Sequence, residues 1–191
     1  DEYGDIQAPQ IETMRESPIS PYSFGKLAST QFLQMLSRTE GFPAVILRLF
    51  LVYGPSQDHK RFLPQVIRGC ASGKPFPMSL GEQLRDFCYV DDVTRGILLA
   101  LRQGDINGEV INIASGIPIK IREIAQKVKV LIGQGDPIFG QIPYRPKENM
   151  ALYADISKAN YLLNWKPETA LEDGILRAIA LYKTNGFLYK K

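Results

Sequence analysis

Apolar residues along the chain switch between helical spacing and short unbroken runs. Helical spacing after Ser20, with stop signals at Gly41 and Pro43, predicts a first long helix. Residues 44–52 form a dense apolar run interrupted only by Arg48, which is typical of a strand buried in a parallel sheet. Further helices are expected over residues 62–70, 91–102, 121–132, 157–163 and 171–183, and further extended segments over residues 76–80, 85–90 and 110–113.

Because helices alternate with strands, the pattern places the chain in the α/β class. Residues 5–21 are polar and contain several prolines, so we expect them to form a loop. On composition alone, a complete small α/β domain is the simplest interpretation of 191 residues.

Composition and charge exclude several classes of protein. A hydrophobic content of 45% and a charged content of 23% are those of a soluble globular protein. The net charge of +3 and the scattered Lys and Arg residues do not indicate nucleic acid, and no apolar run is long enough to span a membrane. Two distant cysteines favour a reducing compartment, so we expect a cytoplasmic protein. His59 lies in a polar loop, and no metal site is expected.

Tyr22 and Lys26 lie four residues apart in the predicted first helix, and therefore on one helix face. A nearby ammonium stabilises a phenolate, so such a tyrosine can act as a general acid/base towards a sugar hydroxyl. On this pair alone, an exposed helix face with no chemical role is the more common explanation.

Residues 20–27 (SPYSFGKL) closely resemble the S-P-Y-x-x-x-K helix of extended short-chain dehydrogenases/reductases, in particular the NAD-dependent nucleotide-sugar epimerase/dehydratase family. Further segments resemble motifs of the same family in the same order. They are residues 3–4 (YG), 48–55 (RLFLVYGP), 85–93 (RDFCYVDDV), 112–116 (NIASG), 145–148 (RPKE), 155–159 (DISKA) and 163–167 (LNWKP).

The resemblance implies a catalytic and cofactor site. Tyr22 is expected to be the acid/base, and Lys26 to assist it and to hold the nicotinamide ribose of NAD or NADP. Leu49 and Phe50 are expected to lie beside the nicotinamide, with core packing as the alternative. Asp91 and Asp92 resemble catalytic paired carboxylates, but the corresponding family segment is mainly structural.

The resemblance also implies a site for a nucleoside-diphosphate sugar. Arg85 and Arg145 stand where two family arginines clamp the diphosphate, and a guanidinium group suits this role because it forms charge-assisted, bidentate bonds to phosphate. Glu148 matches an acid near the nucleotide ribose. The remaining predicted substrate contacts are Phe62, Phe76 and Met78. Core packing is the alternative for these three.

The chain departs from the family pattern at several points. It contains no G-x-x-G-x-x-G loop for the dinucleotide, so we expect a C-terminal portion that lacks the N-terminal half of the sheet and exposes an apolar face. Leu51 stands where the family usually has Asn. Asp1 falls where 4,6-dehydratases carry a catalytic Glu, which tilts the prediction modestly away from a dehydratase.

The expected architecture is a partial doubly wound, Rossmann-type parallel sheet plus a small α/β substrate-binding lobe. Residues 1–57 are predicted to belong to the dinucleotide-binding domain, and residues 58–191 mainly to the lobe, with residues 86–113 returning to the main sheet. The expected function is that of a nucleotide-sugar epimerase or 4-keto reductase that transfers a hydride at a sugar carbon, most simply C4. The alternatives are a 4,6-dehydratase and an inert binding fragment, and a homodimer is expected for the full-length protein.

Overall fold

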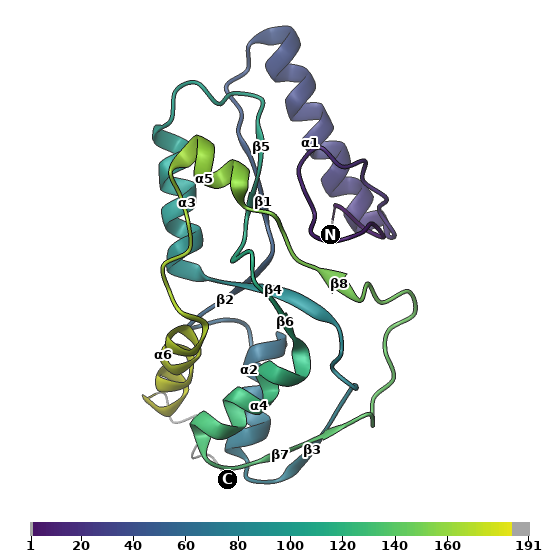
Figure 1. Ribbon diagram of the computed structural model, residues 1–191, viewed down its shortest axis with the longest axis vertical. Helices are drawn as coiled ribbons and strands as arrows, with labels where there is room; N and C mark the ends of the chain where they lie inside the picture. The colour runs from purple at the N-terminus through teal and green to yellow at the C-terminus, as the bar shows by residue number, and fades with distance from the viewer. Residues whose placement is uncertain (1, 185–191) are drawn as a thin grey trace. The chain divides into compact units, whose positions relative to one another are not determined.

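The computed structural model describes residues 2–184, which divide into two compact units (Figure 1). Of these residues, unit 1 contains 2–52, 86–117 and 151–168. Unit 2 contains 53–85, 118–150 and 169–184.

Unit 1 is built around two parallel strands, β1 and β5, which pair from Ile46 opposite Val110 to Leu49 opposite Ile113. In Figure 1, helices α3 and α5 lie together beside this pair, and α5 packs against β5. The elements of this unit are α1 (Pro21–Glu40), β1 (Ile46–Leu49), α3 (Val90–Arg102), β5 (Val110–Ile113) and α5 (Ser157–Leu163).

Helix α1 begins and ends where the sequence predicts. Ser20 is its N-cap and Pro21 its first residue, and the Ser20 hydroxyl accepts a hydrogen bond from the Ser23 N–H at 3.1 Å while the Ser23 hydroxyl accepts from the Ser20 N–H. At the other end, Gly41 adopts a left-handed conformation (φ 65°) that favours glycine. The predicted first helix is confirmed.

The apolar run at residues 44–52 forms two short strands rather than one. The chain leaves β1 at Phe50 and continues as β2 (Leu51–Tyr53), which belongs to a different sheet. That sheet has the order β2-β4-β6, with β8 also pairing with β4. Its other strands are β4 (Leu84–Tyr89), β6 (Pro118–Lys120) and β8 (Ala151–Leu152).

The hydrophobic core of unit 1 surrounds Trp165, which is fully buried. Its indole N–H donates to the Asp92 carbonyl at 2.9 Å, and a Cβ on Gly96 would come within 3.1 Å of the same ring. The other buried members of this cluster are Cys88, Val93, Ala100, Ile106, Ile111, Ile113, Ala159 and Leu163.

Unit 2 packs helices α2 and α4 against a second parallel pair, β3 and β7. A side chain at Gly135 would place its Cβ 2.3 Å from the Cα of Cys70, so glycine allows β7 to approach α2 closely. The elements are α2 (Phe62–Ala71), β3 (Pro75–Met78), α4 (Ile121–Ile132), β7 (Asp136–Phe139) and α6 (Leu171–Thr184).

Both cysteines are buried and unpaired, and burial raises the pKa of Cys70 to about 11 and that of Cys88 to about 12. Because the thiolate is the reactive form, both thiols should be almost entirely protonated at pH 8. We therefore expect Ellman's reagent to modify neither cysteine in the native protein and both after unfolding in urea. Rapid labelling of the native protein would contradict this prediction.

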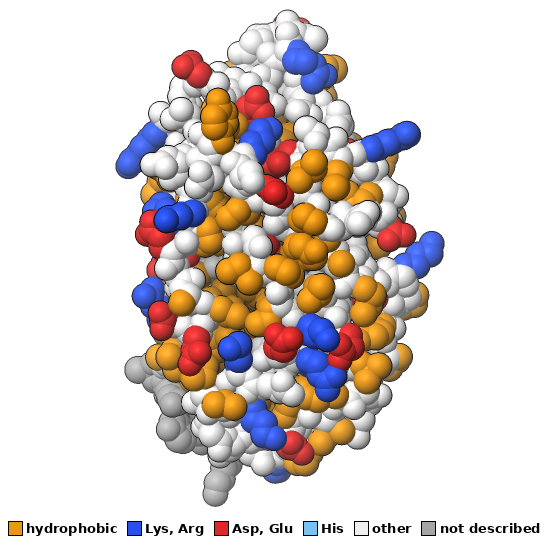
Figure 2. All heavy atoms as spheres, in the orientation of Figure 1, with side chains coloured by type: hydrophobic (Ala, Val, Ile, Leu, Met, Phe, Trp, Pro, Cys, Tyr) orange, Lys and Arg blue, Asp and Glu red, His pale blue; other side chains and the backbone are white. Residues whose placement is uncertain are grey.

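Charged side chains of both signs are interspersed with apolar ones on the face shown in Figure 2. Among residues 2–184, no helix is long and apolar enough to cross a membrane. Within the same residues, no group of three or more His, Cys, Asp or Glu side chains is placed to hold a metal ion.

Candidate active site

Tyr22 and Lys26 lie side by side on the first turns of α1. The Lys26 ammonium nitrogen is 5.6 Å from the centroid of the Tyr22 ring, and 63% of the Tyr22 surface is exposed. The capping box between Ser20 and Ser23 fixes the start of α1 and therefore holds the backbone of Tyr22, which lies between them, in the helical conformation. A phenol and an ammonium are thus presented together on an accessible helix face.

Leu49 and Phe50 follow the buried part of β1. Leu49 is 44% exposed, although it belongs to a strand. Phe50 is half-buried, and its ring centroid lies 6.1 Å from that of Tyr3. The end of β1 therefore presents one accessible apolar side chain and one that packs against the N-terminal segment.

A buried polar cluster surrounds Arg48 in the middle of β1. Its Nε donates to Glu2 at 2.8 Å and its Nη2 to Glu16 at 2.5 Å, while the guanidinium lies 4.6 Å from the centroid of the Tyr3 ring. Burial lowers the pKa of Arg48, but attraction to Tyr3, Glu16 and Glu2 outweighs burial and raises it above the ordinary value. Burial also raises the pKa of Tyr3. Arg48 is therefore a paired, charged group inside unit 1.

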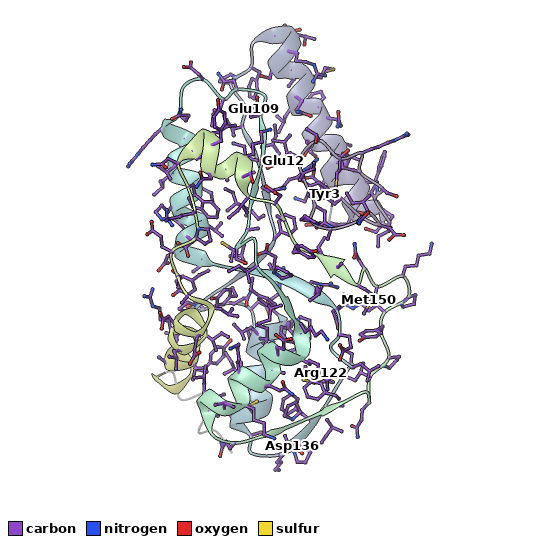
Figure 3. All side chains as sticks on the ribbon, in the orientation of Figure 1. Tyr3, Glu12, Glu109, Arg122, Asp136 and Met150 are labelled. Atoms are coloured by element: carbon purple, nitrogen blue, oxygen red, sulfur yellow. The ribbon has the colours of Figure 1, made fainter. Side chains whose placement is uncertain are left out.

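The segment before α1 also reaches β5 through polar contacts. The Tyr3 hydroxyl donates to the Asn112 side-chain oxygen at 2.7 Å, and the Glu12 carboxylate accepts from the Asn112 N–H at 2.8 Å. Tyr3 and Glu12 are labelled in Figure 3. The predicted loop is thus fixed to both parallel strands by hydrogen bonds.

In unit 2, the contacts of Glu148 bring the predicted diphosphate residues into one neighbourhood. Glu148 forms an ion pair with Arg85, whose side chain is largely buried, and its N–H donates to the Arg145 carbonyl at 3.0 Å. Lys147, at φ 58°, completes this turn, and Arg145 is exposed. Burial lowers the pKa of Arg85, and the charge of Glu148 opposes this effect. Glu148 therefore contacts the Arg85 guanidinium through its carboxylate and the Arg145 backbone through its N–H.

The three predicted apolar substrate contacts differ in burial. Phe62 opens α2 and is half-buried. The Phe76 ring lies against the helix backbone, because a Cβ on Gly69 would come within 2.9 Å of it. Met78 is 7% exposed and belongs to the core of unit 2. Packing explains Phe76 and Met78 well, and a role in binding remains a prediction for all three.

Asp92 has a structural role. Its carboxylate accepts hydrogen bonds from Arg95 at 2.8 Å and from the Glu168 N–H at 3.0 Å, and it is almost fully buried. It therefore attaches the segment after Trp165 to the first turn of α3.

Asp86 accepts several hydrogen bonds from two separate segments, and this structural role was not predicted from the sequence. Its fully buried carboxylate accepts from the N–H and hydroxyl of Ser115, both at 2.6 Å, from the Gly116 N–H at 2.9 Å and from the Ala154 N–H at 3.3 Å. Burial raises the pKa of Asp86, and these donors oppose the rise. The matched RDF motif was the available signal, but it did not indicate the partners.

A sequence profile of the NAD dependent epimerase/dehydratase family matches residues 1–114. The chain therefore belongs to this family of enzymes, as its motifs indicated. The α/β, Rossmann-type fold class is also confirmed, because solved structures of this type superpose on 96% of the chain.

Individual relatives span more than one activity. The chain is 32% identical over 185 residues to an uncharacterized UDP-glucose epimerase, YtcB, of Bacillus subtilis, covering 93% of this chain and 56% of the relative. It is 31% identical over 184 residues to dTDP-glucose 4,6-dehydratase of Xanthomonas campestris, covering 91% and 52%. The chain thus spans a little more than half the length of these curated relatives.

A solved structure shows the same likeness. UDP-glucuronic acid 4-epimerase from Bacillus cereus, in complex with UDP-glucuronic acid and NAD, superposes with a TM-score of 0.88 and 33% identity, covering 96% of this chain and 59% of that one.

Proposed function

We propose that this chain belongs to an NAD-dependent nucleotide-sugar epimerase or 4-keto reductase that transfers a hydride at a sugar carbon, most simply C4. The single observation that carries the proposal is the pairing of Tyr22 with Lys26 on an exposed helix face. Membership of the epimerase/dehydratase family supports it.

The cofactor proposal fits the residues that are present. Lys26 is exposed beside Tyr22, so its ammonium is free to hold the nicotinamide ribose hydroxyls, and the accessible Leu49 and its neighbour Phe50 supply apolar surface for the ring. When bound, NAD or NADP supplies the acceptor and donor of hydride. Solved relatives contain NAD.

In the proposed reaction, Tyr22 handles the proton. Its phenolate oxygen accepts the proton of the sugar hydroxyl as the hydride leaves the same carbon, so the alcohol becomes a ketone. When hydride returns to that carbon, the phenol gives the proton back to the carbonyl oxygen. Return to the opposite face of the same sugar gives net epimerisation, whereas delivery to a separate 4-keto sugar gives reduction.

In unit 2, Arg85 and Arg145 are proposed to hold the diphosphate, and Glu148 to contact the nucleotide ribose. The ion pair between Arg85 and Glu148 orients Arg85 before any ligand arrives, which favours binding by preorganisation. Phe62, Phe76 and Met78 are the proposed apolar contacts of the nucleotide.

Arg145→Ala is expected to raise the Kd for UDP-glucose about tenfold or more, because a charge-assisted contact to phosphate is lost. Isothermal titration with the full-length protein measures this change. Arg102→Ala, at an exposed arginine of α3, is the matched control and should leave the Kd unchanged. Equal affinities for the two variants would contradict the assignment of Arg145.

The proposed function is tested by incubating the full-length protein with NAD or NADP and a panel of UDP-, GDP-, CDP- and dTDP-sugars. An exchanged sugar indicates an epimerase, and NAD(P)H consumption on a 4-keto sugar indicates a reductase. The absence of turnover across the panel would favour an inert binding module.

A 4,6-dehydratase is the second candidate, favoured by the likeness to dTDP-glucose 4,6-dehydratases. A 4-keto product that absorbs in alkali would identify it in the same panel. Asp1, which stands at the position of the dehydratase glutamate, lies outside the described residues. We further propose that the full-length protein is a homodimer without nucleic-acid or membrane partners. We also propose a cytoplasmic location, which two buried, unpaired cysteines favour.

A further inference from the structure

We propose that Glu2 and Arg48 are positioning residues that hold the helix bearing Tyr22 and Lys26 against strand β1. Glu2 acts by linking this helix to the strand, and Arg48 by holding Glu2 in place. This inference rests on the proposed function, because it concerns how the proposed acid/base is held.

Helix α1 contacts the rest of unit 1 through few fully buried side chains. Leu27, Leu33 and Leu36 are half-buried, and the Gln34 side chain donates to the Gly108 carbonyl at 3.2 Å. Of its 20 residues, only Ser23 and Thr30 are buried, and Ser23 is engaged in the capping box. Large apolar side chains of the helix, Phe24, Phe32 and Met35, are exposed. Thr30 is therefore the fully buried side chain of α1 that reaches another segment, and we infer that the placement of the turns near Tyr22 depends on its contact.

Glu2 supplies that contact and connects it to the sheet. The same carboxylate oxygen accepts from the Thr30 hydroxyl at 2.9 Å and from the Arg48 Nε at 2.8 Å. Thr30 lies eight residues after Tyr22, which is about 12 Å along a helix axis. One carboxylate thus bridges the inner face of α1 to the middle of β1.

Arg48 cannot move easily away from Glu2. Its second charge-assisted bond goes to Glu16, and the Tyr3 ring lies over the guanidinium. In the sheet register Arg48 lies opposite Asn112, which accepts the Tyr3 hydroxyl. Both parallel strands therefore contribute to the support on which Glu2 rests.

The Glu2 contact between α1 and β1 bears on the proposed reaction, because Leu49, which follows Arg48 in the chain, is the proposed neighbour of the nicotinamide. The bridge through Glu2 sets the distance between the phenol on α1 and the end of β1. The proton leaves the sugar hydroxyl oxygen and the hydride leaves the carbon that bears it, so the phenol and the cofactor must both reach this one C–O group. A misplacement of about 1 Å can cost about 10²-fold in rate.

Thr30→Val tests the bridge, because valine keeps the shape of threonine but cannot donate to Glu2. We expect kcat of the full-length enzyme to fall about tenfold while KM for the nucleotide sugar stays within about twofold. Thr30→Ser keeps the hydroxyl and should retain nearly full kcat. Thr39→Val is the matched control, since the exposed Thr39 hydroxyl bonds only to the Met35 carbonyl within α1, and it should leave kcat unchanged.

Native-state amide exchange gives a readout that does not need turnover. In Thr30→Val, amides of residues 22–30 should exchange about tenfold faster than in wild type, whereas those of β5 should not change. If Thr30→Val matches Thr39→Val in both kcat and exchange, or if Thr30→Ser fails equally, the positioning proposal is overturned. If wild type itself shows no turnover, the proposed function fails, and exchange alone then decides whether Glu2 holds the helix.

Discussion

Tyr22→Phe is expected to lower kcat of the full-length enzyme by about 10²–10⁴-fold, the usual range for loss of a general acid/base. Phenylalanine keeps the ring beside Lys26 but removes the oxygen that accepts and returns the sugar proton. Because the phenol acts mainly in the transition state, KM for the nucleotide sugar should change far less than kcat. Steady-state kinetics on the best substrate of the panel measures both quantities.

Tyr161→Phe is the matched control for this experiment. Tyr161 is 86% exposed on α5 and should tolerate loss of its hydroxyl without any effect on kcat. Unchanged kcat in Tyr22→Phe would remove the acid/base role. It would leave the Arg85 and Glu148 arrangement as a binding site without this chemistry.

Features that depend on local sequence were predictable. Ser20 and Pro21 mark the start of α1, and Gly41 marks its end, because capping and left-handed backbone conformations are decided by a few adjacent residues. The proximity of Tyr22 to Lys26 follows from helical periodicity in the same way.

Short strands were less predictable. The strands β6, β7 and β8 contain three, four and two residues, which is too short for alternation to be recognised. They form because a neighbouring backbone is available, as when β7 pairs in parallel with β3. The residues of the partner strand, which decide this pairing, lie elsewhere in the chain.

The buried face of α1 illustrates a different limit. Phe32, Met35 and Leu36 contribute to the helical spacing of apolar residues from which this helix was predicted. In the structure Phe32 and Met35 are exposed and Leu36 is half-buried, whereas Thr30 is fully buried. A polar anchor gives no hydrophobic periodicity, so it is recognised only when its partner, Glu2, is seen.

Arg48 gave a partial signal. Arg48 was noted only as an interruption of the apolar run, although an arginine buried in such a run needs charged or polar partners. The chain has 20 acidic residues, however, and nothing local selects Glu2 and Glu16 from among them. Long-range polar pairing depends on the finished fold.

Asp86→Ala is expected to lower the free energy of unfolding by about 3–5 kcal/mol, because several buried N–H groups lose their acceptor and each such loss costs about 1–3 kcal/mol. The backbone N–H groups of Ser115, Gly116 and Ala154 would lose their shared acceptor inside unit 1. The Ser115 hydroxyl loses less, because it also reaches the Ile117 carbonyl. Urea unfolding followed by circular dichroism measures the change.

Asp105→Ala, at an exposed aspartate in the loop after α3, is the control and should change stability by less than about 0.5 kcal/mol. Asp86→Asn should lie between the two, since one amide oxygen still accepts but the NH₂ group faces backbone donors. Burying the Asp86 carboxylate costs free energy of its own, so the measured change in unfolding free energy shows whether its hydrogen bonds outweigh that cost. If Asp86→Ala were as stable as the control, that cost would cancel the gain from the hydrogen bonds, and the segments around residues 115 and 154 would have to be held by packing alone.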